Sequence, residues 1–310
     1  MNINLRAFAQ ETLPLILKTA LLKMSSSKAV ATEIFRVFPL FARVNPQKKL
    51  LMQLQESVVV LNPHPALTSL QRLSKMHLKV RKNKMKFLIL IADIDEFNPC
   101  KKSLGELVLK EYKIKHMPAF DFSYNNHQCT AVCFGIGKVN AAMGAALALN
   151  YDEFDGVINT GGSGAVSGVF KGDIIVSDSC VECDFDLTPI GRLPGQKPGQ
   201  EDYIYKCDNS LYNAACSVEG FKHGNLGTGD FFLTNKELGQ KYKEIFNINA
   251  FDMESGALGA VCYLLNVPFV SVRKISDNAD DVSVSEYTNS VVSDVTAFSD
   301  IVLKILEKLN

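Results

Sequence analysis

Short apolar runs alternate with stretches of helical spacing from Met85 to the end of the chain. Residues 85–92, MKFLILIA, form a continuous apolar run of the kind that becomes a strand buried on both faces. Further strands are predicted over residues 130–134, 156–159, 172–176 and 268–272, and helices over residues 104–112, 141–149, 253–265 and 293–309. Strands that alternate with helices predict an α/β fold with a mixed or mostly parallel sheet.

Residues 1–84 differ from the rest of the chain in pattern and in charge. Their apolar residues predict several short helical segments, broken by prolines between Pro39 and Pro65. They carry 14 Lys and Arg against 3 Asp and Glu, whereas residues 85–310 carry 19 against 30. We therefore expect a basic extension over 1–84, mainly helical or partly disordered, followed by an acidic domain over 85–310.

The extension has three explanations. Its first 30 residues are rich in Lys, Arg and Ser and poor in acids, as in a segment that targets a protein to an organelle. The extension could also be an interaction module. The third explanation is an accessory stretch that lies upstream of a translation start at Met85. Because the sequence carries no secretory signal, we expect a cytoplasmic protein, with an organelle as the alternative.

Charge and hydropathy argue against two kinds of partner. Nucleic acid is not the expected substrate, because its binding depends on neutralising phosphates and the acidic domain has no sustained basic face. A membrane span is not expected either, because no run reaches the roughly 18–20 apolar residues required, and the closest, 13–22, contains Lys18. A small uncharged or zwitterionic ligand fits this composition better.

The eight cysteines are scattered and form no disulfide framework, which favours a reducing compartment. Cys180 and Cys183 make a C-x-x-C pair in the acid-rich, strand-like stretch SDSCVECDFDLT. A metal site would need a second pair or nearby histidines at ligand spacing, and a redox motif would open a helix. We interpret the pair as two ordinary thiols.

Two glycine-rich segments follow predicted strands. Residues 135–140, GIGKVN, lack the length of a P-loop and the third glycine of a dinucleotide fingerprint, so they suit a tight strand-to-helix turn. Residues 160–164, TGGSG, are expected to form a loop directly after a buried strand. Its glycines would let backbone N–H groups approach a ligand at the carboxyl edge of the sheet.

Three acidic residues recur at similar places in this topology. Glu96 follows the first strand, Glu254 stands where a helix begins, and Asp277 follows a late strand. Each of them alone suits a helix cap or a turn. In an α/β sheet, however, such points meet at one rim, so we expect the three carboxylates to converge.

Several separated motifs resemble one family. In chain order they are GIGKVNAA, VINTGGSG, KGDIIVSD, CDFDLT, GQKPG, TGDFFL, DMES and VPFVSVRKISDNAD. From Met85 to the C-terminus the chain resembles the 5′-methylthioadenosine/S-adenosylhomocysteine nucleosidases of the nucleoside phosphorylase superfamily. The resemblance implies a three-layer α/β/α sandwich with a central mixed sheet, a homodimer, a small nucleoside substrate, and neither a metal nor an organic cofactor.

The resemblance also implies roles for individual residues. Asp277 corresponds to the general acid that protonates the purine at N7, and Glu96 to the residue that activates or positions the attacking water. Glu254 corresponds to the acceptor for the ribose hydroxyls, with Met253 packed on the sugar. Phe232 and Leu233 correspond to positions that contact adenine. Ser276 and Arg273 correspond to residues that support the acid. Pro198 corresponds to the residue through which one subunit helps to cover the substrate tail in its neighbour.

The chain departs from the family pattern at two places. Gly162 stands where the family commonly has a serine, and Ser163 follows one position later, so the hydrogen-bonding partner of the purine acid is expected to be rearranged. Asp93-Ile-Asp95 replaces the Met-Glu-Glu that is typical before Glu96, which alters the apolar lining beside the sugar.

The expected reaction is hydrolysis of the N-glycosidic bond of methylthioadenosine, S-adenosylhomocysteine or both. Asp277 must hold a proton although an Asp has a reference pKa of about 3.9, so the site must raise that pKa or relay a proton from solvent. A phosphorylase of the same fold, or another purine nucleosidase, would be the first alternative, but Arg273 and Lys138 form no obvious phosphate clamp. A non-catalytic nucleoside-binding protein is the second, and it would be expected to lack a catalytic acid.

Overall fold

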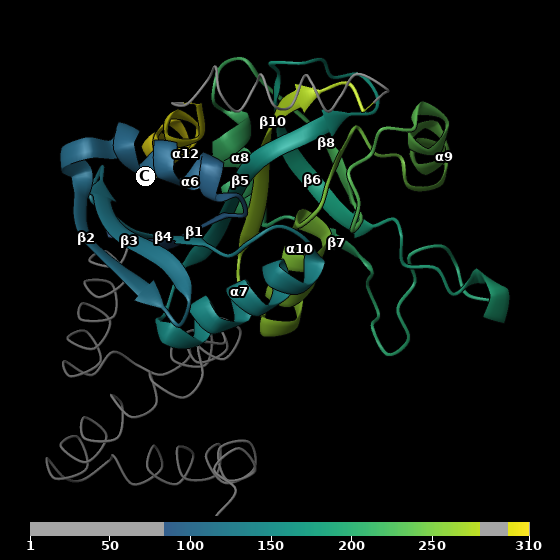
Figure 1. Cartoon of the computed structure of the whole chain (residues 1–310), viewed down its shortest axis with the longest axis horizontal. Helices are drawn as coiled ribbons and strands as arrows, with labels where there is room; N and C mark the ends of the chain where they lie inside the picture. Colours follow the sequence, from purple (N-terminus) through teal and green to yellow (C-terminus); the bar gives the residue numbers. More distant parts are fainter. Residues whose placement is uncertain (1–83, 280–296, 310) are drawn as a thin grey trace, which may run out of the picture. The chain divides into compact units, whose positions relative to one another are not determined.

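Helices cover both faces of one mixed sheet in the computed structural model, which describes residues 84–279 and 297–309 (Figure 1). Apart from Lys84, the predicted extension lies outside the described residues. The strands are β1 (Lys86–Ile91), β2 (Val108–Ile114), β3 (Met117–Tyr124), β4 (His127–Cys133), β5 (Gly156–Ala165), β6 (Ile174–Glu182), β7 (Ile204–Lys206), β8 (Phe221–Thr228), β9 (Ala250–Asp252) and β10 (Phe269–Asp277).

The strand pairing is partly parallel and partly antiparallel. β1 lies between β4 and β5 and is parallel to both, and β10 runs parallel to β5. β6 pairs in parallel with β8 and antiparallel with β10. Because β9 joins β5 to β8, the strands β5, β9, β8, β6 and β10 close into a ring, while β2 and β3 continue the other edge. The predicted mixed sheet is confirmed.

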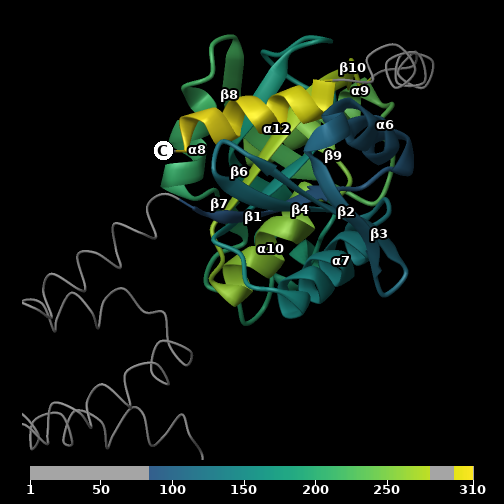
Figure 2. The same ribbon diagram turned by 90° about the vertical axis from the view of Figure 1, so that its left-hand side faces the viewer.

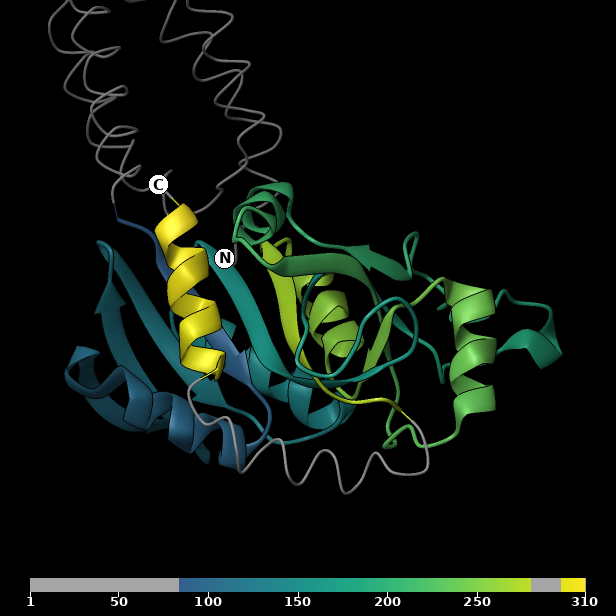
Figure 3. The same cartoon turned by 90° about the horizontal axis from the view of Figure 1, so that it is seen from above.

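The helices form two layers. α7 (Lys138–Tyr151) and α10 (Ser255–Leu265) pack side by side on one face of the sheet, and α6 (Ile94–Leu104), α8 (Asn209–Cys216) and α12 (Ala297–Lys308) cover the other (Figures 1 and 2). α9 (Lys236–Phe246) lies beside the sheet (Figure 3). Two short 3₁₀ helices span Gly105–Leu107 and Thr188–Ile190. This arrangement confirms the predicted three-layer α/β/α sandwich.

The apolar run over 85–92 has the expected place in the core. Residues Phe87 to Ile91 of β1 are buried, since neighbouring strands flank β1 and helices cover both of its faces. In parallel sheets such strands lose the alternation of apolar and polar residues. None of the helices within the described ranges is long and apolar enough to cross a membrane.

Two sequence-based expectations were wrong. The helix predicted over 104–112 instead ends at Leu104, where Gly105 caps α6 with a φ of 51°, and Val108–Ile114 forms the edge strand β2 paired with β3. The TGGSG segment is part of β5 and not a loop, because β10 pairs with it as far as Gly164 and β9 pairs with Gly164 and Ala165. Pairing with distant strands overrode the local preference of glycine for a turn.

Candidate active site

One cavity at the carboxyl ends of the parallel strands borders ten of the eleven predicted site residues. They are Glu96, Gly162, Ser163, Phe232, Leu233, Met253, Glu254, Arg273, Ser276 and Asp277. The eleventh, Pro198, is exposed and is not part of this lining. Three acids that are remote in sequence therefore border the same space, because the strands that precede Glu96 and Asp277 and the helix that follows Glu254 meet at this edge.

Glu96 enters the cavity from the first turn of α6. Its side chain is buried, and Oε1 accepts a 2.9 Å hydrogen bond from the N–H of Gly162. Burial raises the pKa of Glu96 to about 8, although the Gly162 N–H and the positive charge of Arg273 act in the opposite direction. The glycine-rich segment of β5 thus presents a backbone N–H group to a carboxylate of the protein.

Gly161 also has a steric role beside Glu96. A Cβ atom at this position would lie 2.6 Å from Nη1 of Arg273 and 2.9 Å from Oε2 of Glu96. Both separations are too short for a real Cβ contact, so the backbone can approach these two side chains only where residue 161 lacks a side chain.

Glu254 is the N-cap residue of α10 and pairs with a buried arginine. Its Oε2 lies 3.2 Å from Nη2 of Arg273, and its Oε1 accepts a 3.1 Å hydrogen bond from the N–H of Gly137. Nε of Arg273 lies 2.9 Å from Oδ2 of Asp252. Burial raises the pKa of Glu254, and the guanidinium offsets part of this effect. Burial disfavours the charged form of Arg273, but Asp252, Glu254 and Glu96 outweigh it and raise the pKa of this arginine.

Asp277 ends β10 with both carboxylate oxygens engaged. Oδ2 accepts a 2.7 Å hydrogen bond from the hydroxyl of Ser276, and Oδ1 accepts a 2.9 Å bond from the N–H of Ala279. The hydroxyl of Ser163 instead donates to the carbonyl of Phe251 at 2.8 Å. In this structure Ser276 is therefore the hydroxyl partner of Asp277, and Ser163 is not; that Gly162 rearranges this partner relative to the family stays a prediction.

Apolar side chains form a wall of the same cavity. Phe231, Phe232 and Leu233 follow β8 and line the cavity together with Phe251 and Met253. Leu233 is buried, whereas 39% of Phe232 is exposed. The rings of Phe231 and Phe251 pack with centroids 5.2 Å apart. Aromatic and aliphatic groups in one cavity with carboxylates suit a ligand with a flat apolar part and a polar part.

Asp252 was missed by the sequence analysis. It accepts hydrogen bonds from the hydroxyl of Thr228 at 2.7 Å and from the N–H groups of Glu254 and Ser255 at 3.1 and 3.0 Å, and it pairs with Arg273. Its place two residues before Glu254, at the start of a helix, is a signal for an N-terminal capping acid. Its ion pair with Arg273 has no local signal in the sequence.

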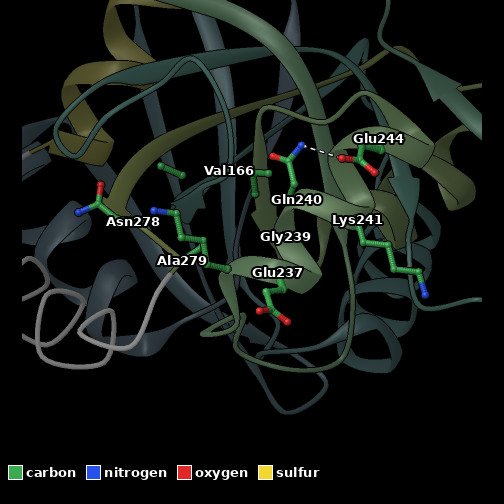
Figure 4. A pocket seen from close by; sticks show the side chains of 10 residues that line it. Val166, Glu237, Gly239, Gln240, Lys241, Glu244, Asn278 and Ala279 are labelled. Atoms are coloured by element: carbon green, nitrogen blue, oxygen red, sulfur yellow. Dashed lines mark hydrogen bonds between the residues drawn. The ribbon is translucent and has the colours of Figure 1, made fainter.

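A second hollow lies beside the cavity, between α9 and the residues that follow β10 (Figure 4). Its lining includes Val166, Asn278 and Ala279, and Nε2 of Gln240 donates a 3.0 Å hydrogen bond to Oε1 of Glu244 on its α9 wall. The three predicted acids do not line it. We therefore place the candidate active site in the first cavity.

Cys180 and Cys183 are free and buried. Burial raises the pKa of both thiols. Both observations are consistent with the interpretation of the C-x-x-C pair as two ordinary thiols, since a buried thiol that keeps its proton is a poor nucleophile and a poor metal ligand.

Comparison with known proteins identifies the family. A family model described as Phosphorylase superfamily matches residues 86–307, a range that includes all the predicted site residues. The chain belongs to the phosphorylase superfamily. This superfamily member is 31% identical over 234 residues to an aminodeoxyfutalosine nucleosidase of Campylobacter jejuni, an alignment that covers 73% of this chain and 100% of the relative.

Two further relatives of this superfamily member are methylthioadenosine/S-adenosylhomocysteine nucleosidases. The protein from Haemophilus influenzae is 32% identical over 206 residues, which cover 64% of this chain and 90% of the relative. A solved structure of the protein from Colwellia psychrerythraea, in complex with adenine, is 29% identical with a TM-score of 0.67, and the match covers 73% of this chain and 96% of that one. The resemblance inferred from the motifs is confirmed.

Proposed function

We propose that this phosphorylase-superfamily member hydrolyses the N-glycosidic bond of 5′-methylthioadenosine, S-adenosylhomocysteine or both and releases adenine. The observation that carries the proposal is that Glu96, Glu254 and Asp277 line one cavity together with aromatic and aliphatic side chains, in a chain whose relatives are nucleosidases. Cleavage places positive charge on the ribose and negative charge on the departing base, so the site must serve both.

The two catalytic acids divide the proton transfers. The C1′–N9 bond breaks with its electron pair moving to the purine, and Asp277 donates a proton to N7, so that adenine leaves as a neutral base. Glu96, as a carboxylate, takes a proton from the water whose oxygen bonds to C1′. The reaction leaves one proton more on Glu96 and one fewer on Asp277, and exchange with solvent restores both.

The remaining residues bind the substrate. Glu254 accepts the ribose hydroxyls and Met253 packs on the sugar, and the negative charge of Glu254 also favours the developing cation. Phe232 and Leu233 hold adenine. The supporting residues act through these groups: Ser276 orients Asp277 through the 2.7 Å bond to its carboxylate, and Arg273 holds Glu254.

Hydrolysis is favoured over phosphorolysis because the cationic side chains in and beside the cavity are already paired with carboxylates. Arg273 is the one cationic side chain among the described residues that line the cavity, and it is paired with Asp252 and Glu254. Lys138 is paired with Glu182 and Asp184. A phosphate dianion would need cations whose charge is not already balanced by carboxylates.

Aminodeoxyfutalosine is a second candidate substrate. The relative from Campylobacter jejuni is named an aminodeoxyfutalosine nucleosidase and aligns over its full length. The same three acids would serve this reaction, because the bond that breaks is again a glycosidic bond to a base. The candidates differ in the group attached to the sugar.

We also propose that two copies pair through α7 and α10. These adjacent helices carry exposed apolar side chains on the face away from the sheet, among them Val139, Met143 and Leu264 with 77%, 37% and 61% exposure. A second copy would cover them. In such a dimer the exposed Pro198 would reach the substrate tail in the neighbouring subunit.

Two further expectations from the sequence stay predictions. One is the division of the chain between residues 84 and 85, with the catalytic domain over 85–310. The other is the cytoplasmic or organellar location.

The test is to incubate the purified full-length chain with methylthioadenosine, S-adenosylhomocysteine or aminodeoxyfutalosine, with and without inorganic phosphate, and to identify the products by chromatography. We expect adenine and a free thioribose product from at least one of the first two nucleosides, independent of phosphate. A sugar 1-phosphate would establish a phosphorylase. Turnover of aminodeoxyfutalosine alone would move the proposal to the second candidate, and no base release from any of the three would refute it.

A further inference from the structure

Lys138, the first residue of α7, holds a group of carboxylates next to the cavity. Its Nζ lies 2.6 Å from Oδ1 of Asp184 and 3.2 Å from Oε2 of Glu182. Its backbone N–H donates a 2.8 Å hydrogen bond to Oδ1 of Asp230, and the N–H of Asp230 donates to Oδ2 of Asp184 at 2.9 Å. The Lys138 side chain is 16% exposed, so solvent only partly screens these contacts.

Both ends of this network adjoin groups to which we assign substrate binding. On one side, Gly137 precedes Lys138 and donates its N–H to Oε1 of Glu254 at 3.1 Å. On the other side, Asp230 directly precedes the apolar residues 231–233, which line the cavity. Lys138 therefore connects the turn at Gly137, which contacts the carboxylate proposed to bind the ribose, with the segment after Asp230, which carries the side chains proposed to bind the base.

The conformation of Gly137 needs this anchor. Its φ of 94° lies in the region that favours glycine, and a Cβ atom there would come within 3.1 Å of Oδ1 of Asp230. Glycine alone would leave this turn free to rotate. The backbone N–H of Lys138 donates to Asp230 and its Nζ pairs with Asp184, so both contacts hold the residue next to the N–H that Gly137 donates to Glu254.

We propose that Lys138 is a positioning residue for nucleoside binding, which aims the Gly137 N–H at Glu254 and keeps the loop after Asp230 against the cavity. Lys138 does not itself line the cavity, so it acts through these groups. Without the charge of Lys138, Asp184 would lose its 2.6 Å ion-pair partner, and Asp184 is the carboxylate that accepts the hydrogen bond from the N–H of Asp230. The backbone N–H of residue 138 would still donate to Asp230. The inference rests on the proposed function.

The test compares Lys138→Met with wild type on methylthioadenosine and on its 2′-deoxy analogue. Because the lost contacts position groups that bind the substrate, we expect KM for methylthioadenosine to rise about tenfold with a smaller change in kcat. The preference for the 2′-hydroxyl should shrink, since the Gly137 N–H, which holds Glu254 together with Arg273, would be less well placed. Lys138→Arg should restore most of the wild-type KM and of the preference for the 2′-hydroxyl. Lys138→Gln, measured in parallel, should behave like Lys138→Met.

Lys222→Met is the matched control. Nζ of Lys222 makes an ion pair of the same length, 2.6 Å, with Oδ2 of Asp173, at the opposite ends of β6 and β8 from Glu182 and Asp230. It should change neither KM nor the preference for the 2′-hydroxyl. If wild type releases adenine but folded Lys138→Met and Lys138→Gln keep the wild-type KM and preference, the positioning role is wrong. If wild type releases no adenine, the proposed function fails instead.

Discussion

The hydroxyl of Ser276 donates a 2.7 Å hydrogen bond to Oδ2 of Asp277, its neighbour in the chain. With the N–H of Ala279 on Oδ1, this bond fixes both oxygens of the carboxyl group. The end of β10 therefore sets the direction of the candidate acid before any substrate arrives.

Asp277→Asn should remove most adenine release, because the amide keeps the shape and the Oδ1 acceptor but cannot donate a proton as an acid does. General acid catalysis contributes about 10²–10⁴-fold, and we expect a loss of kcat in that range. Adenine release and thermal unfolding of the variant measure the two effects. Ser276→Ala, which removes only the orienting bond, should lose less, and near-normal turnover by folded Asp277→Asn would contradict the assignment.

The pH dependence of kcat/KM should report Glu96. Its pKa of about 8 keeps the Glu96 side chain mostly protonated at neutral pH, whereas hydrolysis needs the carboxylate. Glu96 should therefore give kcat/KM a limb that rises with pH through about 8, since kcat/KM follows groups of the free enzyme. Steady-state rates between pH 5 and 10 test this.

Asp93→Asn is the companion variant for that profile. The charge of Asp93 raises the pKa of Glu96, so the rise in activity should move to lower pH without it. The asparagine can still accept the hydrogen bond from the N–H of Asp95 that caps α6, which is 2.9 Å long in the wild type. An unshifted profile would rule out this coupling.

Arg273→Met should destabilise the protein, because the buried carboxylates of Asp252 and Glu254 would lose their counter-charge. Removing one partner of a buried ion pair costs about 3–5 kcal/mol in the free energy of unfolding. Urea unfolding measures this loss. Lys222→Met, which breaks a partly exposed pair with Asp173, should cost no more than about 1 kcal/mol; equal losses would show that burial does not matter here.

Gly161→Ala should impair activity, since the added methyl group must displace Arg273 or Glu96. Misplacing a catalytic group by about 1 Å can cost about 100-fold in rate, and we expect kcat/KM to fall by this order. Gly239→Ala in α9 is the control, because its Cβ would meet Leu233 Cδ2 at an ordinary 3.6 Å. Comparable kcat/KM in the two variants would refute the steric argument.

Val139→Lys should separate the proposed dimer, because a charged side chain would be buried where two apolar faces meet. Sedimentation velocity should give the mass of two chains for wild type and of one chain for the variant. Leu109→Lys, at a position 65% exposed on the edge strand β2, should leave the mass of wild type unchanged. An identical mass for wild type and Val139→Lys would exclude this face as the interface.

The order of elements and the residues around the cavity were largely predictable from the sequence. Apolar runs identified β1 and the core of β5 and β10, and the positions of Glu96, Glu254 and Asp277 at the ends of elements predicted that they would converge. The edge strand β2 was not predictable in this way, because Val108–Ile114 also suits a helix and only its pairing with β3 decides the conformation.

The sequence by itself determined the α/β class and the chemical groups of the site, since apolar periodicity and the acids at element ends are local properties of the chain. The tertiary structure alone decided how these groups are held. Pairing with β9 and β10 turned the glycine-rich segment into a strand, which brought the N–H of Gly162 to Glu96. Burial beside that strand raised the pKa of Glu96. The fold also brought Arg273 into ion pairs with Asp252 and Glu254. Both effects depend on neighbours that are distant in the sequence.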